Sequence, residues 1–183
     1  MDCKNALVEA NGDLGAKDIL RKKSINIAVN RVGREAREGL IAQHILPGAR
    51  VGLLVEVNCQ TDFVAKTDSF RAFADEAARR LAQDPRADLE ALRVEQVHQT
   101  GENVKISRHQ RLERGDTGLI AAYIHHGAKI GVLVEVGAGR EITVDRAEFK
   151  EFVKDITLQV AAANPTVVSR DQIDSAVVAK EKE

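Results

Sequence analysis

Hydrophobic and polar positions follow two different periods along the chain. The apolar segment 51–57 is typical of a buried or half-buried strand. The polar segment 58–64 follows it, and a helix is expected to start near Thr67 or Asp68, because both are favourable N-caps. This helix carries apolar residues at helical spacing on one face: Phe70, Phe73, Ala77 and Leu81. The pattern therefore predicts a strand, a loop and an amphipathic helix.

The same order of elements returns 79 residues further along the chain. The matched segments are 39–42 with 118–121, 48–49 with 127–128, and 54–57 with 133–136. Each copy predicts two strands joined at a Gly-Ala turn, then a loop, then an amphipathic helix. In the second copy the predicted buried face of that helix comprises Phe149, Phe152, Val153, Ile156 and Val160. The phenylalanine pairs of both helices are interpreted as core, and Asp145 with Glu148 is expected to form a capping box.

Further elements are predicted around the two copies. Residues 2–10 favour a short helix, and Asn11-Gly12-Asp13 supplies a stop and a new N-cap. A second helix lined by Ala16, Ile19 and Leu20 follows, and the basic segment 24–37 is interpreted as a solvated helical linker. Between the copies, Asp84-Pro85 ends the first amphipathic helix and 88–97 is a short linker helix.

Two more predictions concern the second half of the chain. Residues 102–108 alternate like a strand, which is interpreted as the extra strand of the second sheet. After Pro165, Ser169 and Gln172 predict a capping box that opens a C-terminal helix running to Glu183.

The predicted fold class is α+β, with two repeated subdomains that each pack an antiparallel hairpin or small sheet against an amphipathic helix. The predicted domains are a partial N-terminal helical module at 1–23, a basic linker at 24–37, a first core subdomain at 38–98, and a second core subdomain with the start of a C-terminal helix at 99–183.

Composition and charge indicate a globular protein and argue against several other classes of protein. Of 183 residues, 44% are hydrophobic and 30% are charged, which is a globular balance. The formal net charge of −1 does not favour a protein that coats nucleic acid or anionic lipid. The longest apolar run is too short to cross a bilayer, and no secretory signal opens the chain. Cys3 and Cys59 have no metal or redox spacing, so a reduced, cytoplasmic setting is expected.

Catalytic chemistry finds little support in the sequence. Cys59 could be paired with His44 or His98 as nucleophile and base, but no acyl-transfer or oxyanion motif accompanies them. His125 and His126 are adjacent and should point apart, which argues against a metal site. Segment 137–139 also lacks the ending of a phosphate-binding loop. We therefore expect no enzyme activity, no cofactor and no bound metal.

The segment Asn58-Cys59-Gln60-Thr61-Asp62-Phe63-Val64, with Ala65, Phe70 and Phe73, resembles the signature of bacterial elongation factor Ts. That family is the guanine-nucleotide exchange factor for elongation factor Tu. The resemblance implies that Thr61, Asp62, Phe63 and Val64 intrude near the magnesium of elongation factor Tu, and that the chain binds this partner in its GDP-bound and nucleotide-free states. It also implies that His126, ahead of Gly127, disturbs the partner's phosphate-binding loop. Whether His125 or His126 takes that role stays open.

The residues themselves leave alternatives at this site. Phe63 stands out because aromatics are 3% of the chain and the second copy has Ile142 at its position. Asp62 is either a partner contact or a cap of the following turn. The resemblance further implies that 1–23 is the middle of a three-helix ubiquitin-associated-like module and that the chain is truncated at both ends. It leaves a homodimer open for the full-length family.

The alternative function is an RNA- or ribosome-associated module that uses Arg21 to Arg37 and Lys105 to Arg111. Aromatic stacking platforms are lacking, and the helix faces carry both signs of charge. We therefore expect no direct contact with nucleic acid and none with a membrane.

Overall fold

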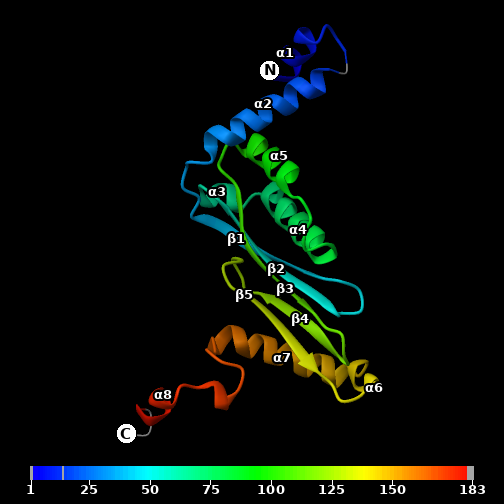
Figure 1. Cartoon of the computed structure of the whole chain (residues 1–183), viewed down its shortest axis with the longest axis vertical. Coiled ribbons are helices and arrows are strands. Elements are labelled where there is room, and N and C mark those ends of the chain that lie inside the picture. The colour runs from blue at the N-terminus through cyan, green and yellow to red at the C-terminus, as the bar shows by residue number, and fades with distance from the viewer. Residues whose placement is uncertain (1, 14, 181–183) are drawn as a thin grey trace.

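The computed structural model describes residues 2–13 and 15–180, and its fold class is α+β, as predicted (Figure 1). Met1 and residues 181–183, where the predicted C-terminal helix ends, lie outside the described residues. The elements in chain order are α1 (Asp2–Glu9), α2 (Ala16–Arg31), β1 (Glu38–Ile45), β2 (Val51–Cys59), α3 (Asp62–Ala65), α4 (Asp68–Gln83), α5 (Glu90–Thr100), β3 (Lys105–Glu113), β4 (Gly118–Ile124), β5 (Gly131–Gly137), α6 (Glu141–Val144), α7 (Ala147–Ala163), the 3-10 helix η1 (Arg170–Gln172) and α8 (Ser175–Lys180).

The first sheet and α4 form the main core. Strands β1, β2 and β3 are antiparallel in that order, and alternate residues of β2 (Leu53, Val55 and Val57) are fully buried. The predicted apolar face of α4 is buried as expected: Phe70, Phe73, Ala77 and Leu81. The predicted start of this helix is also confirmed, because the Thr67 hydroxyl accepts a hydrogen bond from the Phe70 N–H at 3.2 Å.

The partner of β3 corrects the sequence interpretation. β3 pairs with β2 in the first sheet, with Lys105 opposite Asn58, and not with the second sheet. Alternation predicts a strand but carries no information on which edge it joins. The short connection after α5, which packs beside α4, delivers the chain to the free edge of β2. β3, predicted as part of the second subdomain, thus belongs to the first sheet.

The second sheet contains β4 and β5 and packs against α7. The predicted buried face of α7 is wrong in part, because Val153 is buried whereas Phe152 and Ile156 are 53% and 37% exposed. Phe73, which lies 79 residues before Phe152, is only 4% exposed. The two helices differ in how many elements pack against them. α4 packs against the first sheet and α5, whereas in the described part of the chain α7 packs mainly on β4 and β5, so one side of α7 stays exposed.

The predicted capping box of α7 is also wrong. The residue before this helix is Arg146, which has extended torsions and makes no side-chain capping bond. Asp145 instead has helical torsions and closes α6, so its backbone cannot adopt the extended conformation of an N-cap.

The two sheets pack face to face between α4 and α7 (Figure 1). Two reciprocal backbone hydrogen bonds cross between them: the Ile41 N–H donates to the Ala128 oxygen at 2.8 Å, and the Ile120 N–H donates to the Ala49 oxygen at 2.7 Å. Gly52 permits this close approach, since a Cβ there would lie 2.5 Å from Ile120 Cγ2. Each hairpin turn therefore lies against the sheet of the other half.

The N-terminal helices differ from the prediction at their boundaries. α2 begins at Ala16 after Gly15 and has no side-chain cap, so the predicted N-cap in Asn11-Gly12-Asp13 is wrong. α2 continues to Arg31 across the predicted boundary at 23/24, and Ser24 and Ala28 are buried on it. The basic segment 24–37 is thus helical only as far as Arg31, and its helical part is not fully solvated, because α2 packs against α5.

The C-terminal part contains the predicted capping contact in a different context. The Gln172 side chain accepts from the Ser169 N–H at 3.1 Å, but this contact opens only the three-residue 3-10 helix. The α-helix begins later, at Ser175. Among the described residues, no helix has the length and apolarity needed to cross a membrane.

Candidate functional site

The segment predicted as a polar loop contains the one-turn helix α3. Thr61 is its N-cap, with extended torsions and a hydroxyl that accepts from the Val64 N–H at 3.3 Å. Val64 packs against the core and Ala65 is buried, which anchors the helix on one side. Phe63 lies on the other side, with 79% of its surface exposed. A large apolar side chain is therefore presented to the outside.

Asp62 forms an exposed ion pair with Lys66 at 2.6 Å. The hydrogen bond from the Lys66 ammonium is the main cause that lowers the pKa of the Asp62 carboxyl. Backbone N–H groups of Asp62 and Phe63 lower this pKa further, while the N-cap of α3 is Thr61 and not Asp62. Asp62 is thus ionised and accessible at neutral pH.

The turn between β4 and β5 holds its two histidines differently. The His125 N–H donates to the Ile130 oxygen and the Ala128 N–H donates to the His125 oxygen, both at 2.9 Å. The His125 ring also lies in hydrogen-bond contact with the Tyr123 hydroxyl, 2.9 Å from Nδ1. His126 is exposed, and its side chain has no hydrogen-bond partner within the described ranges 2–13 and 15–180. His126 is therefore the freer of the two rings.

A cleft of about 560 Å³ brings α3 and this turn together. Asp62 and Lys66 line one side, and His126 with Gly127 lines the other. The ion pair between Lys129 and Glu38, at 2.8 Å, links the turn to the start of β1. The predicted residues Asp62, His126 and Gly127 thus meet in one cleft, whereas Thr61, Phe63 and Val64 belong to the same segment as Asp62 but do not line it.

The buried Cys59 is not among the residues that line this cleft, and it does not support the cysteine–histidine pair considered from the sequence. Cys59 is fully buried, and burial is the main cause that raises the pKa of its thiol to about 11. A thiol of this kind is not a nucleophile at neutral pH. The described residues contain no group of three or more His, Cys, Asp or Glu side chains that could hold a metal ion.

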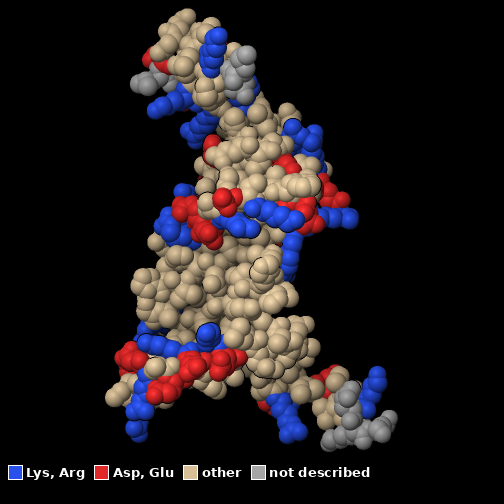
Figure 2. Space-filling view, turned by 180° about the vertical axis from the view of Figure 1, so that it is seen from behind, with Lys and Arg blue, Asp and Glu red and all other residues tan. Residues whose placement is uncertain are grey.

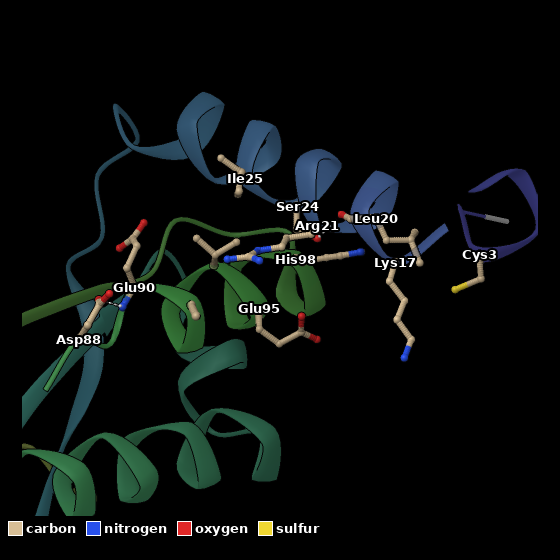
Figure 3. Close-up of a pocket in the computed structure, with 12 residues that line it drawn as sticks. Cys3, Lys17, Leu20, Arg21, Ser24, Ile25, Asp88, Glu90, Glu95 and His98 are labelled. Atoms are coloured by element: carbon tan, nitrogen blue, oxygen red, sulfur yellow. Dashed lines mark hydrogen bonds between the residues drawn. The ribbon is translucent and has the colours of Figure 1, made fainter. Parts of the chain in front are cut away.

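A second cavity, of about 750 Å³, lies between α2 and α5 (Figure 3). Cys3 from α1, Arg21 from α2 and His98 from α5 are among its lining residues. It shares no lining residue with the cleft beside α3. α2 and α5 are therefore in contact, but their side chains do not fill all of the space between the two helices.

The basic segment from Lys105 to Arg111 is not uniformly cationic. It is partly neutralised, because Arg108 pairs with Glu56 at 2.6 Å and Arg111 pairs with Glu113. Arg111 also donates to the backbone oxygen of Ala82 at 3.1 Å. The face seen in Figure 2 carries both signs of charge side by side, with an uncharged area between the charged bands. This pattern does not favour the RNA-binding alternative.

One residue of the site was missed at the level of sequence. The Glu102 carboxylate, which lies between α5 and β3, accepts a hydrogen bond from the Thr61 hydroxyl at 2.6 Å. The two residues are far apart in the chain, and no periodicity links them. A lone acidic residue in a connection gives no sequence signal that could have identified it.

Comparison with known proteins gives a consistent result. A family model described as Elongation factor TS matches residues 60–183. Curated relatives named Elongation factor Ts include those of Nostoc punctiforme, 40% identical over 201 residues, and Clostridium kluyveri, 40% identical over 200 residues. That of Symbiobacterium thermophilum is 37% identical over 191 residues. The alignments cover all of this chain, which spans 63–64% of the length of these relatives.

Proposed function

The chain belongs to the elongation factor Ts family, and we propose that it is a guanine-nucleotide exchange factor that acts on elongation factor Tu in translation. One observation carries the proposal: the exposed ring of Phe63 stands on α3 beside a cleft that also holds the free ring of His126. Two separate contacts can thus reach one nucleotide site at the same time.

In this proposal Phe63 is the wedge that displaces the magnesium-binding elements of elongation factor Tu. An aromatic ring buries a large apolar area while few rotamers are frozen. Mg²⁺ requires near-ideal octahedral geometry, so a small displacement of its ligands weakens its hold on the phosphates. Thr61 caps α3 and Val64 packs it against the core, while the Asp62 carboxylate provides a charged contact beside Phe63.

His126 and Gly127 supply the second contact, against the phosphate-binding loop of the partner. His126 is assigned this role because the ring of His125 is already in contact with the Tyr123 hydroxyl. Gly127 leaves the tip of the turn narrow, since it has no side chain.

The exchange requires no bond to be made or broken by this chain. A factor that binds the nucleotide-free partner more tightly than the GDP-bound one must weaken GDP binding by the same factor. Each tenfold weakening corresponds to about 1.4 kcal/mol of differential contact. The factor is thus proposed to bind both states and to act in the cytoplasm, where the translation machinery operates.

We also infer that the two halves are copies of one unit. α3 and α6 lie 79 residues apart and have the same length. The turns agree as well, since Gly48 and Gly127 have φ values of 87° and 88°, and Ala49 and Ala128 have 52° and 54°. α1 and α2 are proposed to belong to a ubiquitin-associated-like module.

The direct test is release of a fluorescent GDP analogue from elongation factor Tu, measured with and without this chain. We expect release to accelerate with increasing chain concentration and to saturate. An unchanged release rate at micromolar concentrations of a folded chain would refute the proposal. A response that disappears at moderate salt would point instead to electrostatic RNA-like binding.

A further inference from the structure

Glu102 makes an unusually complete set of contacts with the start of α3. Its carboxylate accepts hydrogen bonds from the Gln60 N–H at 2.9 Å, the Thr61 N–H at 3.1 Å and the Thr61 hydroxyl at 2.6 Å. Hydrogen bonds to an ionised acceptor are stronger than neutral ones. The residue that caps α3 is therefore itself held by a residue from the connection between α5 and β3.

The next residue extends the same network toward the N-terminal helices. The Asn103 N–H donates to the Gln60 side-chain oxygen at 2.9 Å. Its side-chain amide donates to the backbone oxygens of Arg34 at 2.6 Å and Val32 at 3.3 Å, just after α2. Asn103 is only 1% exposed, so these bonds are made away from water. A continuous set of hydrogen bonds thus joins the exit of α2 to α3.

The second half of the chain provides an internal comparison. α6 has the same length as α3 and is likewise preceded by a residue with extended torsions, Arg140. No side chain of the described residues caps α6 in the way that Thr61 caps α3. The backbone turn therefore forms without this network. Within the described part of the chain, the capped start of α3 is thus a feature that α6 lacks.

We propose that Glu102 and Asn103 are positioning residues that fix α3, and hence the ring of Phe63, and join it to the exit of α2. A four-residue helix cannot persist alone, because one turn does not repay the cost of nucleation. Among the described residues of α3, Val64 and Ala65 are the side chains that pack in the core. The consequence for exchange rests on the proposed function, but the positioning itself is a property of the free chain.

Hydrogen exchange of the free, full chain tests the positioning directly. In Glu102→Ala the Val64 amide should exchange about ten- to a hundredfold faster, since a charge-assisted bond that stabilises its acceptor is lost. Glu102→Gln should restore part of the protection. Glu113→Ala is the matched control, because that carboxylate lies at the far end of β3 and bonds to Arg111.

The pattern of exchange along the chain decides between positioning and general stability. Amides of α4, such as that of Ala77, should be unchanged in every variant. Unchanged exchange at Val64 in Glu102→Ala would overturn the proposal, and so would equal acceleration in α3 and α4, which would show a global loss of stability. Asn103→Ala should also loosen the segment that leaves α2.

A double-mutant cycle then tests whether Glu102 acts through Phe63. In stimulated GDP release, Glu102→Ala should lower the saturating rate more than tenfold in the parent chain and less than twofold in a Phe63→Ala chain. An equal loss in both backgrounds would show that Glu102 acts independently of Phe63. If the parent chain fails to stimulate release, the proposed function fails, while the exchange at Val64 still decides the positioning.

Discussion

Truncating the exposed ring of α3 by Phe63→Ala separates the candidate contact from the fold. Phe63 is 79% exposed, so its removal leaves no cavity in the core. Surface substitutions away from caps and cores change the free energy of unfolding by no more than about 0.5 kcal/mol. The melting temperature of Phe63→Ala should therefore match that of the parent chain.

The effect on stimulated GDP release should be large. Most of the Phe63 surface is available for burial in the partner, and full burial of such a side chain contributes roughly 1.5–3 kcal/mol. If that contact is made only in the exchange intermediate, its loss slows stimulated release about 10- to 150-fold. A drop in the saturating rate, rather than in apparent affinity alone, marks a contact specific to that intermediate.

A stopped-flow assay of fluorescent GDP release from elongation factor Tu provides the measurement. The matched control is Ile142→Ala, because Ile142 is the exposed apolar residue at the corresponding position of α6. It should leave the rate within twofold of the parent chain. With excess EDTA, the loss in Phe63→Ala should shrink, since magnesium no longer holds the nucleotide. A rate for Phe63→Ala within twofold of the parent, with magnesium present, would refute the wedge mechanism.

Three further predictions concern other parts of the chain. His126→Ala should slow stimulated release more than His125→Ala, and the reverse ranking in the same stopped-flow assay would assign the contact to the other ring. Because burial raises the pKa of Cys59 to about 11, a thiol reagent at pH 8 should modify only Cys3 in the folded chain and both thiols after denaturation; two fast modifications in mass spectra would contradict this. Gly52→Ala should lower the free energy of unfolding by about 1–3 kcal/mol through overpacking between the sheets, and an unchanged denaturation midpoint would show that the sheets separate freely.

The local signals of the sequence predicted individual elements well. The apolar run before Asn58 is β2, and Thr67 caps a helix whose predicted apolar face is buried. These features depend on residues that are near each other in the chain, so periodicity and capping chemistry contain enough information. The exposure of Phe63 also agrees with its interpretation as a contact residue, although its role stays a prediction.

Long-range features could not be predicted in the same way. The alternation at 102–108 gave a strand but not its pairing with β2. The helical spacing of Phe152 predicted an apolar helix face, but it could not predict that part of this face stays exposed. Glu102 bonds to a residue far away in the chain, and only the folded structure brings the two together. In each case the missing information is tertiary, and single-chain patterns do not contain it.

The reciprocal hydrogen bonds between the sheets have a consequence for how the molecule tolerates change. They hold each hairpin turn against the sheet of the other half, so that α3 and the turn at His126 come from opposite halves yet line one cleft. Neither half, expressed as a separate fragment, would carry both contacts. Substitutions that impair function should then cluster in two segments, around α3 and around the turn at His126, which are distant in the sequence but adjacent in space. A second substitution that restores function should arise most readily in the other of these two segments.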